Sequence, residues 1–399
     1  MTLKCRNCKC ENLTSILNLG EHFLSDFRDD LSKPPKFPLN LLLCEKCSLV
    51  QLSETVSRDL MYHDGYGYRS GTNELIQENL KWIVSLGIDF VPEPKSWLDI
   101  ACNDGTLLSF VDQNIEKVGV DPVAKFAEES ERHATRIISD FFSSKIVSQK
   151  FDVITSISMF YDLDDPSEFV KEVSDCLNPN GVWLIQQNYL AAMLENVSFD
   201  NICHEHITYF SLTALKNLFD KNNLEIIGLD FPTINGGSIL TVVGHKGRFT
   251  KSELVERVLA EEYQQGLSTV EGYEKFEKAV FANIELLSEF LDGVRERKQT
   301  VQIYGASTRG GTIWQSLGFH LDVVDAAVER QAEKIGKYYS VIGKPIISEE
   351  EMRKSPPDYL LIGPWFLRKS FLERESNYIN NGGAMVFPLP HMNVVSSVE

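Results

Sequence analysis

The stretch that decides the fold is Leu98-Asp99-Ile100-Ala101-Cys102-Asn103-Asp104-Gly105-Thr106-Leu107. An apolar strand pattern ends there in acidic and small residues, and a helical pattern follows. A second apolar run, further along the chain, ends at Asp121. In nucleotide-binding sheets, small residues after the first strand let a ligand approach the backbone, and an acidic residue after the second strand binds the ribose hydroxyls. The stretch therefore predicts a nucleotide-type site at the edge of a parallel sheet.

Strand and helix patterns alternate around this stretch. Apolar runs typical of buried strands lie at 97–100, 117–120, 136–138, 151–157 and 181–187, with helical patterns at 124–133 and 167–177. This alternation predicts a doubly wound α/β sheet. After two helices expected between 251 and 297, a second alternation has strands expected at 301–304, 323–328, 359–362 and 384–387. It predicts a second, Rossmann-like α/β domain.

Charge and hydropathy exclude several classes of protein. The chain has 399 residues, and its 39 basic and 57 acidic side chains give a net charge of −18. Bare nucleic acid and anionic membrane surfaces attract basic proteins, so neither is an expected partner. No apolar run approaches the roughly 20 residues of a membrane-spanning helix, and the N-terminus has no apolar signal core. We expect a cytoplasmic protein that acts on a small molecule.

The N-terminal residues hold two Cys-x-x-Cys pairs, Cys5 with Cys8 and Cys44 with Cys47. Each pair can supply two corners of a tetrahedral zinc site, and four thiolates leave no open position for catalysis. A short, loop-rich segment needs such a staple to fold. The pairs predict one structural zinc in a module over 1–64, although Cys10 competes with Cys8 and four unrelated thiols are the alternative. Little regular structure is expected in the Pro-rich stretch 33–38 and in the Tyr- and Gly-rich stretch 62–71.

The class of cofactor can be inferred from motifs that the site at 98–107 lacks. The Gly-x-Gly-x-x-Gly sequence of NAD-binding loops is absent, and residues 101–105 leave no bare helix N-terminus for a pyrophosphate. A nucleoside cofactor without phosphates fits better, and S-adenosylmethionine (SAM) is one, with an ammonium group that acidic residues can hold. At this point the chain resembles the class I SAM-dependent methyltransferases.

That resemblance implies a role for the polar residues at the strand ends. Asp99 and Gly105 would frame the methionine part of SAM, Asp121 would bind the ribose and Asp140 would lie near the adenine. The full set that the resemblance assigns to the cofactor is Asp99, Ala101, Asn103, Gly105, Asp121, Asp140 and Ser156. Ala101 departs from the family, which usually has Gly there. A plain strand-turn-helix without a ligand is the alternative.

The densest group of reactive side chains is His204-Glu205-His206. A zinc-binding His-Glu-x-x-His sequence puts its two histidines on one helix face, and this spacing does not. If the segment is extended, His204 and His206 share a face and Glu205 points away. A histidine near a carboxylate is suited to act as a general base at neutral pH. A metal site and a purely structural role are the alternatives.

Over its full length the chain resembles the three-domain sugar C-methyltransferases, which act on nucleotide-linked keto-deoxysugars. That family has a cysteine-zinc module, a SAM domain and a C-terminal α/β domain. The matching motifs are the block 204–211, the Tyr-rich stretch 66–71, the turn 236–238, the loop 304–310 and the blocks 382–383 and 388–390. The resemblance implies domains at 1–64, 65–230 and 231–399.

The resemblance also implies a mechanism. His206 would take a proton from the carbon beside a carbonyl group, and the enolate carbon would then attack the SAM methyl group. Glu205 would orient the histidines or balance their charge, and a tyrosine from Tyr66 and Tyr68 would cover the sugar. With His204, these residues make up the expected catalytic set.

Two features leave the substrate and the reaction open. The sugar-modifying branch usually has Tyr where this chain has Cys203, and a thiol is a weaker hydrogen-bond donor than a phenol. That branch also tends to have His in the loop that contains Tyr161. O- or N-methylation of a sugar or another small metabolite is the enzymatic alternative, and a non-catalytic SAM- or nucleotide-binding protein is the other.

The loop 304–310 follows an expected strand and precedes an expected helix. One interpretation is a pocket for the pyrophosphate of the substrate, formed by the helix N-terminus and Arg309. The other is a Rossmann-like turn that only packs. The sequence leaves both open.

Overall fold

The stretch 98–107 includes the end of β5 (Ser96–Ile100), an internal strand of a seven-stranded sheet. The computed structural model describes residues 3–57, 60 and 69–397, so Tyr66 and Tyr68 lie outside the described residues. The order across this sheet is β11 (Leu224–Asp230), β12 (Ser238–His245), β9 (Leu177–Asn188), β8 (Phe151–Ile157), β5, β6 (Glu116–Val120) and β7 (Arg136–Ile138). β12 runs opposite to the other six strands, which share one direction. The sheet confirms the doubly wound α/β fold.

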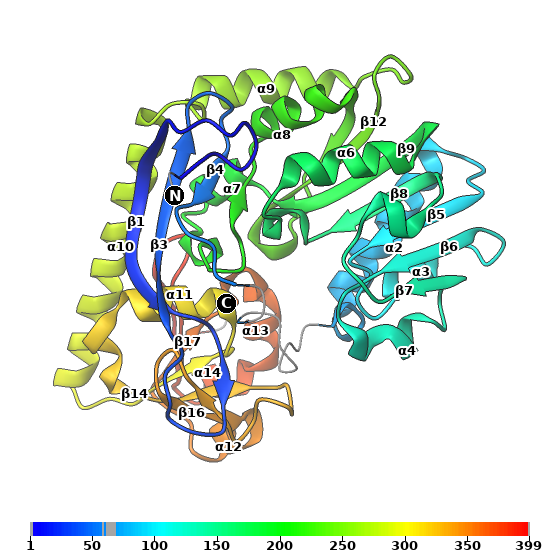
Figure 1. Cartoon of the computed structure of the whole chain (residues 1–399). Coiled ribbons are helices and arrows are strands. Elements are labelled where there is room, and N and C mark those ends of the chain that lie inside the picture. The colour runs from blue at the N-terminus through cyan, green and yellow to red at the C-terminus, as the bar shows by residue number, and fades with distance from the viewer. Residues whose placement is uncertain (1–2, 58–59, 61–68, 398–399) are drawn as a thin grey trace.

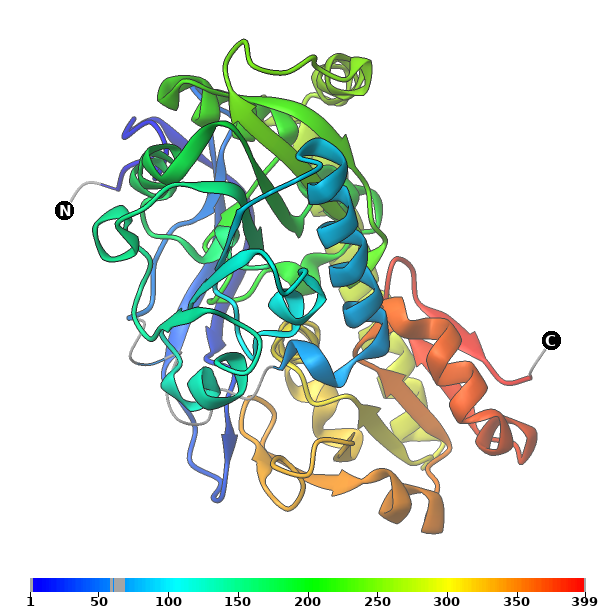
Figure 2. The same cartoon turned by 90° about the vertical axis from the view of Figure 1, so that its right-hand side faces the viewer.

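Helices cover both faces of this sheet because its strands are apolar on both sides. On one face, Trp97 packs with buried residues of α2 (Glu74–Phe90). On the other, Leu98 and Ile100 pack with buried residues of α6 (Pro166–Cys176). Alternate residues of a strand point to opposite faces, so β5 is buried along its whole length. Figure 2 shows α2, in blue, lying across the sheet.

The sheet does not end at residue 230, where a domain boundary was expected. The chain turns at 234–237 and returns as β12, which pairs with both β9 and β11. Its residues 238–244 are buried, so this strand is an internal part of the sheet. The chain then leaves for α9 (Glu253–Gln265) and α10 (Glu271–Glu296), the two helices expected between 251 and 297. The structure places the end of the seven-stranded sheet at His245.

The N-terminal module has more regular structure than its composition suggests. The long strand β1 (Leu13–Phe23) pairs with β3 (Lys36–Cys44), and β4 (Val50–Leu52) continues the sheet. The expectation of little regular structure in the stretch 33–38 is wrong for residues 36–38, which begin β3. Its alternate residues Leu39, Leu41 and Leu43 enter the same core as buried residues of α10, and this burial outweighs the proline in the strand. Figure 1 shows β1 and β3 running along α10.

The C-terminal domain is a second α/β unit, as expected. Its eight-stranded sheet has the order β19 (Asn393–Val395), β18 (Ala384–Phe387), β17 (Tyr359–Ile362), β13 (Val301–Tyr304), β14 (Val324–Glu329), β16 (Lys344–Ser348), β15 (Tyr338–Tyr339) and β2 (Phe27–Arg28). The helix α11 (Thr308–Ser316) follows β13. The strands from β18 to β16 are parallel, which confirms the Rossmann-like character. Of its strands, β13, β14, β17 and β18 had been predicted, and β2, β15, β16 and β19 had not.

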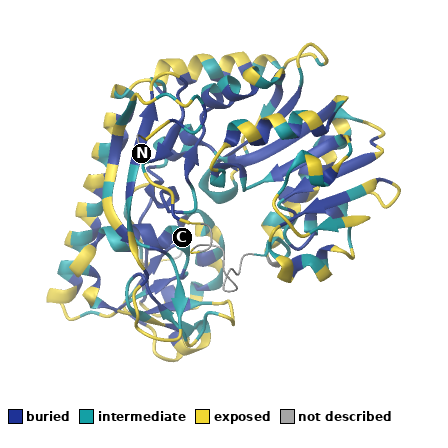
Figure 3. Cartoon of the chain, viewed as in Figure 1, coloured by how far each residue is buried: buried dark blue, intermediate teal, exposed yellow. Residues whose placement is uncertain are grey.

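The three parts exchange strands. From the N-terminal module, β2 joins the edge of the C-terminal sheet. From the central part, β10 (Thr208–Tyr209), which follows the histidine block, pairs with β4 of the N-terminal sheet. Figure 3 shows the buried sheets and the exposed outer sides of α9 and α10. Across the described ranges, no helix has the length and apolar composition needed to span a bilayer.

Candidate active site and metal centre

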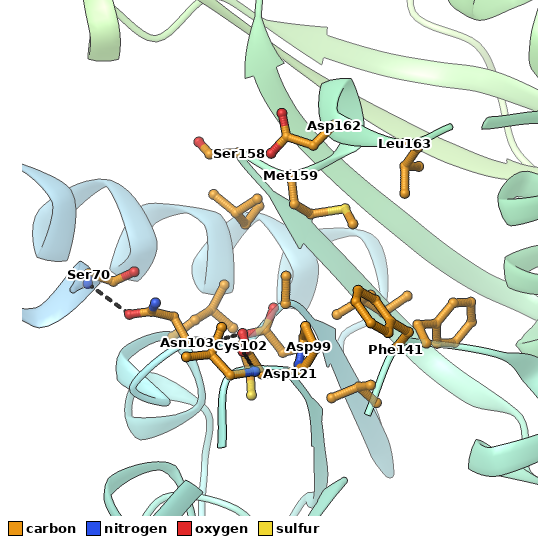
Figure 4. A pocket seen from close by; sticks show the side chains of 18 of the residues that line it. Ser70, Asp99, Cys102, Asn103, Asp121, Phe141, Ser158, Met159, Asp162 and Leu163 are labelled. Carbon is orange, nitrogen blue, oxygen red and sulfur yellow. Dashed lines mark hydrogen bonds between the residues drawn. The ribbon is translucent and has the colours of Figure 1, made fainter. Parts of the chain in front are cut away.

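A cavity of about 780 Å³ lies where β5, β6 and β8 end. Figure 4 shows its side chains converging from these strand ends. Five of the residues expected to bind the cofactor line it: Asp99, Ala101, Asn103, Asp121 and Asp140. The cavity is at the carboxyl edge of the parallel strands, where open α/β sheets bind their ligands.

Backbone amides hold the Asp121 carboxylate in place. Asn103 N donates to Oδ2 at 2.8 Å, and Val123 N donates to Oδ1 at 2.9 Å. Burial raises the pKa of Asp121, and these two hydrogen bonds oppose the rise. Each carboxylate oxygen has a further lone pair. The group can therefore accept from a diol without losing its backbone partners.

Asp99 is more deeply buried, with 3% of its surface exposed. Thr155 Oγ1, on the neighbouring strand β8, donates to Asp99 Oδ1 at 2.7 Å. Burial raises the pKa of Asp99 to about 7, and the hydrogen bond from Thr155 opposes this. At neutral pH the carboxyl group is balanced between its neutral and charged forms, so a bound cation would shift it to the carboxylate.

The turn after β5 is left-handed at two residues that are not glycine. Ala101 has φ +62° and Asn103 has φ +52°. The Asn103 side chain accepts a hydrogen bond from Ser70 N at 3.1 Å (Figure 4), which helps to hold the turn. An alanine in this conformation is disfavoured by its Cβ atom. The departure from glycine at Ala101 thus carries a conformational cost.

Two of the residues expected to bind cofactor lie behind the cavity wall. Ser156 is fully buried, and its hydroxyl accepts from Trp183 Nε1 at 3.1 Å. Gly105 has φ +76°, and a Cβ atom there would lie 2.8 Å from Ser130 Cα. Neither residue lines the cavity. Both of them pack against neighbouring residues, and their role in binding the cofactor stays a prediction.

Sequence reasoning missed several residues that line the cavity. Phe141, Met159 and Leu163 supply apolar surface suited to an adenine ring. Acidic side chains continue the wall beside them: Asp162, Asp164, Asp165, Glu168 and Glu172. An acidic wall suits a cofactor that carries both a sulfonium and an ammonium. Their positions in the sequence could have indicated this, because Phe141 and Met159 follow the ends of β7 and β8 by three and two residues.

The four predicted cysteines form one cluster. Their sulfur atoms all lie within 4.8 Å of one another, with Cys5 and Cys8 each 3.5 Å from a sulfur of the second pair. Zinc–sulfur bonds of about 2.3 Å in a tetrahedron put the sulfurs about 3.8 Å apart, so the donor set fits zinc. Cys10 stays outside the cluster, and its sulfur accepts from Asn12 N. The site is a closed, structural one.

The histidine block is a turn, so the prediction for an extended segment does not apply. His206 N donates to Cys203 O at 3.1 Å, which closes the turn. His204 is buried, and its Nε2 lies 3.0 Å from Phe37 O of β3. The His206 ring instead lies against Tyr161, with ring centroids 4.4 Å apart. Within the described residues, neither histidine joins a potential metal cluster.

The surroundings of His206 select one tautomer. Its Nδ1 lies 2.9 Å from Asn201 O, and a carbonyl oxygen only accepts, so Nδ1 carries the proton. The lone pair is then on Nε2. Burial and the positive charge of Arg309 lower the pKa of His206 to about 4, so the ring is neutral at physiological pH. A neutral imidazole with a free Nε2 is a proton acceptor.

Glu205 faces the C-terminal domain. The Cys203 thiol lies 3.9 Å from its Oε2, and the Thr308 hydroxyl at the start of α11 also hydrogen-bonds to it. Burial raises the pKa of Glu205 to about 7, and these two contacts oppose the rise. Hydrogen bonds between Glu205 and either histidine are absent from the described part of the chain. Its expected role in orienting them stays a prediction.

Arg309 does not have the free guanidinium that a pyrophosphate site needs. Its Nε and Nη2 lie 2.9 and 2.7 Å from Asp200 Oδ2, and its Nη1 donates to Asn235 O at 2.7 Å. The preceding loop is also closed, because a Cβ atom at Gly305 would lie 2.5 Å from Pro364. These contacts favour the interpretation in which the loop 304–310 packs.

Comparisons with known families cover the chain in three consecutive parts. A model of a zinc-binding domain matches residues 5–62, a methyltransferase domain matches 72–229, and a C-methyltransferase C-terminal domain matches 233–390. The chain is also 25% identical over 413 aligned residues to C-methyltransferase NovU of Streptomyces niveus, covering 99% of this chain and 97% of NovU.

Two solved structures each match less than half of this chain. The PH0226 protein of Pyrococcus horikoshii is 17% identical with a TM-score of 0.37, covering 45% of this chain and 95% of that protein. An S-adenosylmethionine-dependent methyltransferase of Clostridium acetobutylicum is 16% identical with a TM-score of 0.36, covering 42% and 91%.

Proposed function

We propose that this chain, a SAM-dependent C-methyltransferase with an N-terminal zinc-binding domain, methylates a carbon atom of a nucleotide-linked keto-deoxysugar and uses His206 as the general base. The observation that carries the proposal is the hydrogen bond from His206 Nδ1 to Asn201 O. It leaves Nε2 as the basic atom. We place the reaction in the cytoplasm.

His206 is connected to the cofactor cavity through the loop after β8. Its ring contacts Tyr161, and the neighbours Met159 and Asp162 both line the cavity. Asp99 and Asp121 would hold SAM from the opposite side, at the ends of β5 and β6. SAM supplies an electrophilic methyl group. These contacts support a base that acts from beside the cavity, one contact away from its lining residues.

The proposed reaction begins with proton transfer. His206 Nε2 takes a proton from the carbon beside the carbonyl, and the electrons of that C–H bond form the enolate. The enolate carbon then attacks the methyl group of SAM and forms the new carbon–carbon bond. The carbon–sulfur bond breaks, and its electrons remain on the sulfur of S-adenosylhomocysteine. A bound diphosphate would add negative charge near the ring and raise the pKa of His206 toward a more useful value.

The substrate class rests on the full-length resemblance and on the similarity to a C-methyltransferase. Tyr161 lies beside His206, and its phenol is a stronger hydrogen-bond donor than the thiol of Cys203. O- or N-methylation is the competing function, because a neutral His206 can also deprotonate a hydroxyl group. The two functions differ in the atom of the product that carries the new methyl group, which is carbon in one and oxygen or nitrogen in the other.

The test uses the full chain with zinc, SAM carrying a ¹³C methyl group, and a panel of nucleoside-diphosphate keto-deoxyhexoses. We expect S-adenosylhomocysteine to accumulate and NMR to find the label on carbon. His206→Asn should lower turnover by about 10²–10⁴-fold, the usual cost of losing a general base. His204→Asn is the matched control and should keep most of the turnover. Label on oxygen, or undiminished turnover in His206→Asn, would refute the proposal.

A further inference from the structure

The segment that precedes the histidine block is held by the C-terminal domain on both sides of Asn201. Asp200 and Ile202 are both buried, and each accepts a hydrogen bond from a side chain of α11. Between them, the Asn201 carbonyl accepts from His206 Nδ1. The carbonyl that sets the His206 tautomer is thus held from α11, whose residues do not line the cofactor cavity.

The first anchor is an ion pair. Arg309 and Trp365 both reach one oxygen, Asp200 Oδ2, and the Trp365 Nε1 contact is 3.1 Å. Only 15% of the Arg309 side chain and none of the Asp200 side chain is exposed. An arginine whose donors converge on a buried carboxylate fixes the orientation of that group. Asp200 is therefore locked in position and in rotamer.

The second anchor comes from the same helix. Thr312 Oγ1 donates to Ile202 O at 2.7 Å. Arg309 and Thr312 are three residues apart on α11, so they lie on one face of it. This face holds the side chain of Asp200, immediately before Asn201, and the backbone carbonyl of Ile202, immediately after it. A shift of α11 would move the Asn201 carbonyl with it.

We propose that Arg309 is a positioning residue for the methyl transfer: through Asp200 it fixes the Asn201 carbonyl, which holds the proton on His206 Nδ1 and leaves Nε2 free to act as the base. The inference rests on the proposed role of His206. Arg309 also donates to Asn235 O, next to Ile234, which lines the cofactor cavity. One side chain thus connects the base to the wall of the cofactor site.

The experiment must avoid leaving Asp200 buried without a partner, which destabilises a fold strongly. The main variant is therefore Arg309→Met with Asp200→Asn, which removes both charges together. Arg309→Lys keeps the charge but loses the fork of donors. Lys369→Met removes a cation of the same domain whose side chain is 90% exposed, and it is the matched control. Thr312→Val removes the second anchor alone, and it keeps the proposal testable if the double variant fails to fold.

The main readout is the ¹⁵N chemical shift of the two His206 ring nitrogens, assigned by comparison with His206→Asn. We expect a protonated Nδ1 in the wild type and in Lys369→Met, and a mixture of tautomers in the double variant. The double variant should lose kcat by about ten- to hundredfold, the range for partners that orient an active group. Its KM and its affinity for SAM should stay within about twofold of the wild-type values. Arg309→Lys and Thr312→Val should fall between wild type and the double variant.

Unchanged ring shifts and an unchanged kcat in the folded double variant would overturn the inference. A loss of kcat with an unchanged tautomer would also overturn it, because Arg309 would then act only on domain packing. Failure of the proposed function looks different: His206→Asn would be fully active, while the ring shifts would still report whether Arg309 controls the tautomer.

Discussion

The Thr155 hydroxyl donates a hydrogen bond to Asp99 Oδ1 over 2.7 Å, joining the ends of two adjacent strands at the cofactor cavity. Burial raises the pKa of Asp99 to about 7 in spite of this bond. A hydrogen bond from a neutral donor stabilises the carboxylate less than burial destabilises it. The protein therefore keeps, at the base of its cavity, an acid that is half protonated at neutral pH.

SAM binding is expected to release a proton from Asp99. Below pH 7 the free protein holds a proton on this group, and the SAM ammonium favours the carboxylate, so binding expels the proton. Affinity should rise between about pH 5.5 and 7.5 and then level off. Calorimetry in buffers of different ionisation enthalpy measures the released proton, and Asp99→Asn should abolish the release. Affinity that falls with rising pH would contradict the assignment.

Asp121 is expected to hold the ribose hydroxyls. Asp121→Ala should weaken SAM binding by about 1–3 kcal/mol, the scale for losing hydrogen bonds to a charged group. Glu128→Ala is the control, since that side chain of the same domain is 90% exposed. Calorimetric affinities that are equal for wild type and Asp121→Ala would remove Asp121 from the site.

Because the backbone at Ala101 is left-handed, we expect replacement of this alanine by glycine to stabilise the fold. Glycine has no Cβ atom to clash at φ +62°, although it loses more chain entropy on folding. Ala101→Gly should therefore raise the free energy of unfolding by about 0.5–1 kcal/mol. Ala127→Gly, at an ordinary helical φ of −57°, should lower it by a similar amount. Denaturant unfolding compares the two, and a loss of stability in Ala101→Gly would show that the turn is not strained.

The cysteine cluster should hold about one zinc per chain. Cys44→Ser should lower zinc content and melting temperature, because β3 ends at this cysteine and packs against α10. Cys10→Ser should keep the zinc, since its sulfur lies outside the cluster. Metal analysis by mass spectrometry gives the result. Zinc-free wild-type protein, or zinc loss in Cys10→Ser, would contradict the assignment.

The sequence predicted features that neighbouring residues encode. The acids at the ends of β5 and β6, the two cysteine pairs and the helices α9 and α10 follow from local spacing and periodicity. Asp99 and Asp121 converge because parallel strands end at one edge. For these features, knowing which residues are close in the chain was sufficient.

Features that depend on distant pairing were missed. The return of β12 into the sheet and the exchange of β2 and β10 between sheets have no local signature. The same holds within the site. His204 hydrogen-bonds to the carbonyl oxygen of Phe37, and Arg309 forms an ion pair with Asp200. A turn at 203–206 separates the two histidines, and its shape depends on these remote contacts. Sequence patterns identified the reactive residues but not the partners that give them different roles.

The most direct test of the central claim is hydrogen exchange at the substrate carbon. The full chain is incubated in D₂O with S-adenosylhomocysteine and a nucleoside-diphosphate keto-deoxyhexose that it methylates, so that proton abstraction is observed without methyl transfer. The account predicts deuterium at the carbon beside the carbonyl with wild type and with His204→Asn, and exchange about 10²–10⁴-fold slower with His206→Asn. Equal exchange rates in wild type and His206→Asn would contradict it.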